Sequence, residues 1–583
     1  MSFLLAYNKN EPEGRMRKNI LIKGDVSLKN ESAILLMKGE IYNCEEKDII
    51  NIIKKDGINN ISKLLGEFCL VYDDIESQKI YIINDRSGRE VVFYYWDNER
   101  FIVSDDFWEI INVIEPTQND INIQNLKESL VFYYPLFWGT IINNLYFLPP
   151  ASIGEFSLKE NSLKIKKYWD FKYNIDWSLT LDDAVEMLDD SLNKAFLFIK
   201  SKNSPQTIYG VGISGGLDSR IIPYYALKYG MKLKSFIIGE SRPDKFLLSR
   251  DHKNARKIAK YYGLDHYEVE YNSEPFNKKI FWDIRYFPMG VSQIFVTLRD
   301  TVPNFDVLLT GASGLLVGSA LPSQIEVMSR DELFTQIINQ FSQIDIYYSF
   351  TTKLRKLLNY FGVHGFKNPP ERKEIEPIEG IIKPEEFEQA LQKIRKFVDC
   401  RKDKSNLDIF EEYFYLFLGS RNKYGAFESL QGRQKSYSIY SPFLLDTVLK
   451  WKTEFLIGRK VLKHLILKKI PSLSNIMPQN FQVAISQESS QLLPIYKVIS
   501  LVDLLIRGGG VGPFERWARR KDYLSFSTSI LFRKNRLFEE YFDTKYIVEQ
   551  MSKRKINFRL YDQLIKIKMV MDILEEGIYE DFK

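Results

Sequence analysis

The sequence predicts a mixed α/β fold in which antiparallel β-sheets come first, a parallel α/β sheet follows and a largely helical region comes last. Three observations support this order. Short β-branched and aromatic runs fill the first 172 residues, strand and helix patterns alternate from residue 206, and helical patterns dominate after residue 330. Because 583 residues are too many for one ordinary core, we expect one domain at residues 1–172 and a second at 173–583.

The first domain is rich in short runs that end in turn-forming residues. Examples are FCLVYDD, KIYIIND, VVFYYWD and RFIVSDD, and each mixes aromatic and β-branched residues. Such runs are typical of β-strands. Their spacing predicts stacked antiparallel sheets, that is, an antiparallel β-sandwich.

The second domain opens on a helix at residues 181–201, which has acidic early turns and a lysine-rich end. After it come a strand in QTIYGVGIS, a helix in SRIIPYYALKY, a strand in LKSFIIG, a helix in DHKNARKIAKYYG, and strands in HYEVEY and NFDVLLTGASG. Alternation of this kind predicts a parallel sheet. In the helical region, residues 365–387 are rich in proline and charge and predict an exposed loop, and residues 506–521 predict a second break.

Composition argues against several classes of protein. A net charge of +5 is small for this length and does not suggest a nucleic-acid binder. The three cysteines form no CxxC pair and the four histidines are scattered, which argues against a disulfide framework, a structural zinc and an imidazole metal site. No apolar run reaches the roughly 18 residues of a membrane span, and the N-terminus does not resemble a signal peptide, so we expect a cytoplasmic protein.

Residues 211–220 read VGISGGLDSR and lie where a predicted parallel strand gives way to a helix. Ligands of open α/β sheets bind at the carboxyl ends of strands, where backbone N–H groups and a helix N-terminus attract anions. Small residues let phosphate oxygens approach the main chain, Ser214 and Ser219 can donate hydroxyl hydrogens, and Asp218 suits the Mg²⁺ that accompanies a nucleotide. The alternative interpretation is a glycine-rich turn with a helix cap.

This motif and several others resemble a known family. SGGLDS resembles the PP-loop of ATP pyrophosphatases, while GEIYN at residues 39–43, LLGEFCLVYDD, NDRSGREVVFYYW and FIVSDD resemble a class II glutamine amidotransferase domain. YSPFLLD and GRKVLKHLILKKIP resemble later elements of the asparagine synthetase-like family, which includes asparagine synthetase B, β-lactam synthetases and lasso-peptide cyclases. The resemblance implies an Ntn-hydrolase-like first domain and a PP-loop ATP pyrophosphatase second domain with a helical C-terminal region.

The resemblance also implies roles for individual residues. ATP and Mg²⁺ are the expected cofactors, with Asp218 and Asp251 as metal ligands. Arg459 falls where the family has a phosphate-contacting lysine, with Lys460 and Lys463 close by, so these three are the expected catalytic cations. The residues expected to contact ATP are Ser214, Gly215, Gly216, Leu217, Asp218, Ser219, Gly239 and Gly311.

Two departures from the family bear on activity. Its glutaminase uses an N-terminal cysteine exposed by removal of Met1, but Ser2 stands here, and a hydroxyl is far less ionised than a thiol. The loop TGASGLLVGSA carries Leu315 and Leu316 where the family has an acidic pair, although the loop glycines remain. We therefore expect no glutaminase activity, and either Asp251 supplies the missing metal ligand or metal binding is weakened.

The expected function is that of an ATP-dependent ligase that adenylates a carboxylate and joins it to an amine without using glutamine. Within the family the best match is a peptide macrocyclase of the lasso-cyclase type, whose partners would be a carboxylate-bearing precursor peptide and a leader-peptide-binding protein or protease. An ammonia-dependent asparagine synthetase-like enzyme and a non-catalytic nucleotide- or peptide-binding scaffold stay open as alternatives. The stretches GGGVG and ERWARRK are interpreted as a hinge and a solvated helix face.

Overall fold

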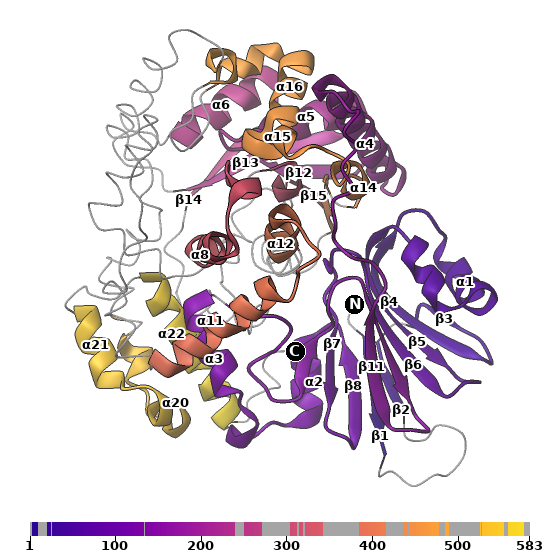
Figure 1. Cartoon of the computed structure of the whole chain (residues 1–583), viewed down its shortest axis with the longest axis vertical. Helices are drawn as coiled ribbons and strands as arrows, with labels where there is room; N and C mark the ends of the chain where they lie inside the picture. The colour runs from indigo at the N-terminus through magenta and orange to yellow at the C-terminus, as the bar shows by residue number, and fades with distance from the viewer. Residues whose placement is uncertain are drawn as a thin grey trace.

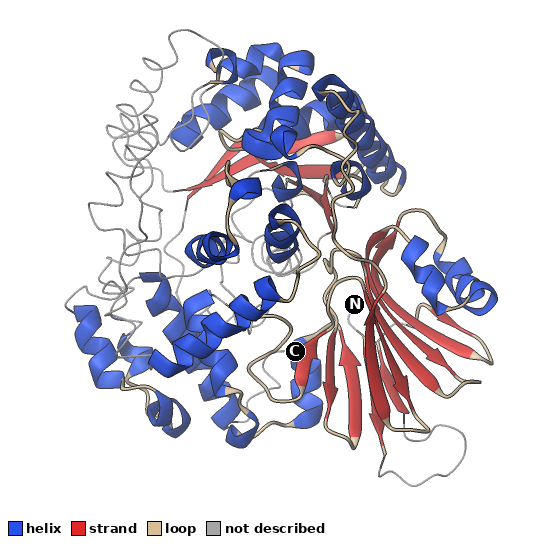
Figure 2. Cartoon of the chain, viewed as in Figure 1, coloured by secondary structure: helices blue, strands red, loops and turns tan. Residues whose placement is uncertain are grey.

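In the computed structural model, the described part of the chain forms three β-sheets with helices around them (Figure 1 and Figure 2). Two sheets are antiparallel and come from the first part of the chain, and the third is parallel and follows them. The described residues are 3–9, 20–24, 26–132, 134–239, 250–270, 304–311, 314–318, 321–341, 384–415, 435–440, 442–476, 484–488, 525, 528–552 and 558–576.

The antiparallel strands are β1 (Leu4–Asn8), β2 (Ile20–Lys23), β3 (Leu28–Lys29), β4 (Ala33–Ile41), β5 (Gly66–Asp74), β6 (Lys79–Asn84), β7 (Phe93–Trp96), β8 (Arg100–Ser104), β9 (Leu145–Phe147), β10 (Ser152–Ser157) and β11 (Ser162–Lys167). One sheet has the order β2-β1-β8-β7-β9, and the other has the order β11-β10-β6-β5-β4-β3. The two sheets pack face to face, because Phe101 of the first stacks on Phe156 of the second with ring centroids 4.2 Å apart. The predicted β-sandwich is confirmed.

Helices cover the outer faces of both antiparallel sheets. On one side, α1 (Ile49–Asp56) buries Ile53 in a cluster with Phe68 of β5. On the other side, α2 (Phe107–Ile114) packs against β7, because the ring centroids of Phe107 and Phe93 lie 5.8 Å apart. The resulting order of layers is helix, sheet, sheet, helix.

The parallel sheet consists of β12 (Ile208–Gly212), β13 (Lys232–Gly239), β14 (His266–Glu270), β15 (Val307–Thr310) and β16 (Lys435–Ser438). Its order is β14-β13-β12-β15-β16, and every neighbouring pair is parallel. From β12 the chain therefore adds β13 and β14 on one side of the sheet, and it later adds β15 and β16 on the other side. Loops that leave the carboxyl ends of β12 and β15 face each other at this reversal, which is where open α/β sheets bind ligands.

The helices around and after the parallel sheet are α4 (Leu181–Ser201), α5 (Asp218–Lys228), α6 (Arg250–Tyr262), α8 (Arg330–Phe341), α11 (Pro384–Asp399), α12 (Asn406–Glu412), α14 (Leu445–Val448), α15 (Thr453–Leu456), α16 (Lys460–Lys469), α20 (Arg536–Tyr541), α21 (Thr544–Ser552) and α22 (Phe558–Glu576). The predicted helix at 181–201 and the strand–helix alternation after it are confirmed. None of the described helices is both long and apolar enough to cross a bilayer.

Two predictions on the helical region have different outcomes. The predicted loop at 365–387 is wrong for its last four residues, because α11 begins at Pro384, and proline suits the first turn of a helix, where its missing N–H is not needed. The rest of that stretch and the predicted break at 506–521 lie outside the described residues.

The antiparallel and parallel sheets meet through side chains. Glu40 at the end of β4 accepts hydrogen bonds from Lys435 and from the hydroxyl of Tyr437, the latter at 2.7 Å, and both donors lie on β16. The ring of Tyr42 stacks on that of Phe443 at 4.9 Å. The proposed boundary between residues 172 and 173 stays a prediction.

Candidate functional site

The loop from β12 to α5 holds its shape through two serines. The backbone N–H of Ser214 donates to the Ser219 hydroxyl at 2.8 Å, and the backbone N–H of Gly216 donates to the Ser214 hydroxyl at 3.1 Å. The two hydroxyl oxygens lie 3.2 Å apart, so one of them donates to the other. The Ser214 and Ser219 hydroxyls, which were predicted to donate to a ligand, thus stabilise the loop itself. One hydroxyl hydrogen remains for a ligand.

Several backbone N–H groups of this loop have no partner. Among the described residues, the N–H groups of Gly215, Leu217, Asp218 and Ser219 make no hydrogen bond. The last two belong to the first turn of α5, where a helix cannot satisfy its own donors. Unpaired donors around a helix N-terminus form an anion site, and this one lies at the strand-order reversal of the parallel sheet.

Glycines let neighbouring elements approach the loop. A Cβ at Gly215 would lie 2.6 Å from Nδ2 of Asn254 on α6, and a Cβ at Gly311 would lie 2.8 Å from the Cβ of Asp218. By contrast, a Cβ at Gly216 would meet, in the described part of the chain, only the Ser214 hydroxyl, at 3.2 Å. Gly215 and Gly311 are therefore required by packing, whereas Gly216 keeps one side of the loop clear.

Asp218 is held by two side chains from the C-terminal region. Its two oxygens accept bonds from the Arg459 guanidinium at 2.6 and 3.1 Å, and one also accepts a bond from the Tyr440 hydroxyl. Burial and then the Asp218 carboxylate raise the pKa of Tyr440 well above its usual value, so the phenol is the donor. Burial lowers the pKa of Arg459, but the attraction of Asp218 outweighs this, and the net shift is upward. The bidentate pair is thus fully charged.

Arg220 lies behind the loop, fully buried. Its guanidinium donates to the backbone oxygens of Gly215 at 3.0 Å, Leu473 at 3.0 Å and Ile476 at 2.8 Å. These partners are neutral, and burial lowers the pKa of the guanidinium only to about 10, so the charge persists near neutral pH. A buried cation with neutral hydrogen-bond partners favours an anion on the open side of the loop.

The residues proposed to hold Mg²⁺ do not fit that ion as they are placed. Both oxygens of Asp218 are taken by Arg459 and Tyr440. Asp251 lies in the first turn of α6, on the helix that reaches Gly215 through Asn254, but a search of the described residues finds no group of three or more acidic, histidine or cysteine side chains that could hold a metal. Hard cations need several oxygen ligands, so the geometry supports no step through a metal.

The loop after β15 has an apolar interior. Leu316, at one of the two positions where the family has acids, is fully buried in the main hydrophobic core. Gly318 has φ +79°, and a Cβ there would lie 2.0 Å from the backbone oxygen of Leu456. The loop is therefore tightly packed, and an acid at position 316 would need a buried partner.

The other predicted positions are spread over the same region. Gly239 ends β13, at the carboxyl edge of the sheet that also carries the loop. Lys460 is exposed on α16, and the amine of Lys463 pairs with Glu488 at 2.7 Å. The structure thus brings Arg459 to the loop and gives Lys463 a different partner.

Sequence reasoning missed Arg220 and Tyr440. Arg220 carried a signal, because it directly follows SGGLDS and begins an otherwise apolar helical pattern. Tyr440 begins YSPFLLD, a stretch that resembles a later element of the family, but its contact with Asp218 depends on tertiary structure that the sequence does not specify. Ser2 lies outside the described residues, so the absence of glutaminase activity stays a prediction.

Comparison with known proteins points to one family. Residues 204–314 match the family model described as asparagine synthase. The chain is 24% identical over 259 residues to "Putative asparagine synthetase [glutamine-hydrolyzing] 2" of Methanocaldococcus jannaschii, a match that covers 40% of this chain and 47% of that one. It is 22% identical over 344 residues to "Asparagine synthetase [glutamine-hydrolyzing] 2" of Bacillus subtilis, covering 50% and 43% respectively. The chain thus spans less than half the length of these curated relatives.

Solved structures give weaker likenesses. A glutamine phosphoribosylpyrophosphate amidotransferase from B. subtilis, complexed with ADP and GMP, is 11% identical with a TM-score of 0.17, covering 50% of this chain and 58% of that one. An NH3-dependent NAD synthetase from Campylobacter jejuni is 12% identical with a TM-score of 0.17, covering 38% and 95%. At these TM-scores neither likeness carries an argument.

Proposed function

Because this chain belongs to the asparagine synthetase-like family, we propose that it is an ATP-dependent ligase that activates a carboxylate and joins it to an amine. The observation that carries the proposal is the set of four unpaired backbone N–H groups from Gly215 to Ser219, with the buried charge of Arg220 behind them. Neutral ligands would gain little from such a site, whereas a phosphate chain would satisfy both the donors and the charge.

The proposed reaction has two steps. A carboxylate oxygen of the substrate attacks the α-phosphorus of ATP, the bond between the α-phosphorus and the bridging oxygen breaks, and pyrophosphate leaves. An amine nitrogen then attacks the acyl carbon of the adenylate, AMP leaves with the bonding electrons, and the amine loses a proton. Most of the help that a protein can give here is positioning and stabilisation of the charge on pyrophosphate.

The loop and Arg459 divide this work in the proposal. The unpaired N–H groups bind the phosphate oxygens, while Arg459 stabilises the leaving pyrophosphate. Two of the three guanidinium nitrogens bond Asp218, and the third, Nε, makes no hydrogen bond among the described residues. Asp218 therefore aims Arg459 at the loop, and the arginine can turn toward phosphate when an anion arrives.

The amine is proposed to come from the substrate itself and not from glutamine. The supporting observation is Ser2, which replaces the thiol that a glutaminase of this type needs. An intramolecular amine leads to a macrocycle, as in lasso-peptide cyclases, and this is the product we propose. Free ammonia is the second option, and it would give asparagine or a related amide.

The test measures pyrophosphate and AMP released from ATP by the full chain, with a precursor peptide encoded beside its gene. We expect release that depends on the peptide and does not need glutamine, and a peptide product lighter by one water. Glutamate release that is lost in Ser2→Ala would contradict the proposed amine source. Failure of every carboxylate tried to release pyrophosphate would contradict the ligase itself.

A non-catalytic scaffold is the second candidate, and a specific observation favours it. Leu316 is buried where the family has an acid, and Asp218 is engaged by Arg459. Pyrophosphate release from Asp251→Ser and Leu315→Asp separates the two candidates. Turnover in the wild type that is lost in Asp251→Ser supports an enzyme in which Asp251 compensates, whereas turnover that appears only in Leu315→Asp supports a decayed site.

A further inference from the structure

A cleft of about 540 Å³ lies between the antiparallel sheets and α11, away from the nucleotide loop. One wall comes from β11, which contributes Ile165 and Lys167, and the opposite wall comes from α11. The connection between α3 (Ile123–Phe132) and β9 closes one end with Phe137 and Trp138. All of these elements are distinct from those that form the PP-loop.

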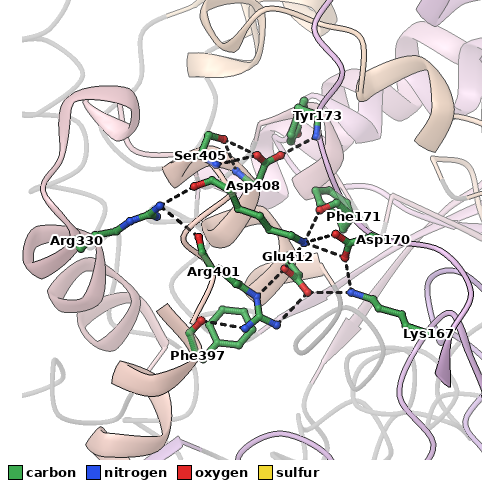
Figure 3. A network of polar contacts seen from close by, with 11 residues as sticks. Lys167, Asp170, Phe171, Tyr173, Arg330, Phe397, Arg401, Ser405, Asp408 and Glu412 are labelled. Atoms are coloured by element: carbon green, nitrogen blue, oxygen red, sulfur yellow. Dashed lines mark hydrogen bonds and ion pairs between the residues drawn. The ribbon is translucent and has the colours of Figure 1, made fainter. Parts of the chain in front are cut away.

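Among the charged residues that line this cleft, cations outnumber carboxylates. Lys167, Lys393, Lys396 and Arg401 line it. Lys393 pairs with Glu128. Lys167 pairs with Asp170 and Glu412, and Arg401 pairs with Glu412 (Figure 3). The buried amine of Lys404 also pairs with Asp170 and Glu412. Five cations therefore face three carboxylates. In the described part of the chain, Lys396 is exposed and makes no ion pair, so the excess charge is available to a ligand.

Aromatic rings supply the apolar part of the cleft. The rings of Phe137 and Phe397 lie 5.7 Å apart, and Arg401 lies over the ring of Phe397 at 3.6 Å. Phe137 has φ +60°, a conformation that a bulky residue adopts only under constraint. Next to it, Glu128 accepts a hydrogen bond from the N–H of Leu136 at 3.0 Å, which helps to fix the backbone. Backbone strain of this kind is concentrated at functional sites, where it presents a side chain in a fixed direction.

An edge strand lies beside the aromatic rings. β11 is the terminal strand of its sheet and pairs with β10 only, so its outer backbone groups have no partner strand among the described residues. Its sequence SLKIKK adds lysines to the edge, and Ile165 is 41% exposed. Lysines on an edge strand generally prevent another strand from pairing with it, but a strand that carries acidic side chains would be attracted to them.

We propose that this cleft binds a peptide segment that carries acidic side chains next to aromatic ones. An extended peptide beside β11 has the backbone groups to pair with the edge strand, and its alternate side chains, about 7 Å apart, can reach the lysines and the rings together. A small aromatic carboxylate could use the rings and one lysine but not the edge strand. The inference does not depend on the ligase proposal, because binding is tested in the absence of ATP.

The test is fluorescence anisotropy with a fluorescein-labelled hexapeptide that carries glutamate, phenylalanine and glutamate at every second position with serine between them, so that the acids and the ring share one face of a strand. We expect saturable binding by the full chain, weakened about fivefold or more by Lys396→Glu and by Trp138→Ala. Lys402→Glu changes net charge equally on an exposed residue outside the lining, and we expect it to bind within about twofold of wild type.

Three outcomes would overturn the proposal. The first is equal binding of the same peptide with glutamine in place of glutamate. The second is an equal loss in Lys396→Glu and Lys402→Glu, which would reduce the effect to net charge. The third is no binding up to millimolar peptide, or displacement of the peptide by ATP, which would assign the cleft to nucleotides.

Discussion

Asp218 and Glu412 are both carboxylates that form a bidentate pair with an arginine, yet their surroundings differ. The Asp218 side chain is 27% exposed and lies beside unpaired backbone N–H groups. The Glu412 side chain is 3% exposed and is also bonded by Lys167 and Lys404 (Figure 3). A carboxylate bonded by several cations in the interior holds elements together, whereas one that shares its arginine with an open anion site is placed to respond to a ligand.

The largest effect should come from Glu412. Glu412→Gln leaves three cations around a neutral amide in a buried place, and removal of one partner of a buried pair costs about 3–5 kcal/mol of stability. Urea unfolding of the full chain measures it. Asp446→Asn is the control, because both oxygens of Asp446 also accept from an arginine, here from one nitrogen of Arg86, but Asp446 is 61% exposed, and we expect a loss of less than about 1 kcal/mol. Equal losses of unfolding free energy in Glu412→Gln and Asp446→Asn would contradict the claim that burial makes the Glu412 pairs structural.

Glu411, the neighbour of Glu412, sharpens the comparison because none of the described cations bonds it. Burial raises the pKa of Glu411 to about 8, so the folded chain keeps a proton that the unfolded chain loses near its ordinary value. Stability should therefore fall as pH rises from the unfolded value through the folded one, by at most about 1.4 kcal/mol per pH unit.

The check is urea unfolding at pH 6 and pH 8 for wild type and Glu411→Gln. We expect wild type to lose roughly 2 kcal/mol more than the variant over this interval. A variant with the same pH dependence as wild type would mean that Glu411 is ionised in the fold.

A smaller effect is expected from Asp218. Asp218→Asn removes a negative charge beside the proposed phosphate site and frees Arg459, so ATP affinity measured in EDTA should rise by roughly fivefold, or about 1 kcal/mol. Its effect on stability should be far below that of Glu412→Gln. Isothermal titration calorimetry with and without Mg²⁺ makes the measurement. An affinity that depends on Mg²⁺ in wild type and not in Asp218→Asn would instead establish Asp218 as a metal ligand.

The smallest effect is expected from Lys463. Its amine pairs with Glu488 and not with the loop, so Lys463→Met should change ATP affinity by less than about twofold. Arg459→Met, the comparison in the same assay, should lose most of the pyrophosphate release. A larger loss in Lys463→Met than in Arg459→Met would reverse the roles of the two cations.

Much of the fold could be predicted because local patterns and tertiary structure agree. The strand and helix on either side of SGGLDS, and the helix at 181–201, form where periodicity places them. β16 was not predicted, because KSYS is a short, polar edge strand whose pairing with β15 depends on the rest of the sheet.

The site was predictable only in part, for a similar reason. The loop residues 214–219 form one contiguous motif, so their role was open to inference from sequence. Arg459 was expected at the phosphate site only from the family resemblance. Its pairing with Asp218, and that of Tyr440, join residues more than two hundred positions apart, and nothing local in the sequence specifies them. Leu316 is a further example. The sequence shows a leucine where the family has an acid, but the burial of that leucine in the core is known only from the structure.

The central claim is that the loop binds the phosphates of ATP. The most direct test is to measure ATP binding after one methyl group has been added to the loop. Among the described residues, the Cβ that Gly216→Ala adds meets only the Ser214 hydroxyl, at 3.2 Å, so the variant should cost little stability and obstruct the open face of the loop. Gly212→Ala is the control, since the nearest atoms to its Cβ among the described residues are those of the Phe236 ring, at 3.9 Å, and it precedes the loop. Calorimetry should show that wild type and Gly212→Ala bind ATP and that Gly216→Ala does not. Wild-type affinity in Gly216→Ala would contradict the claim.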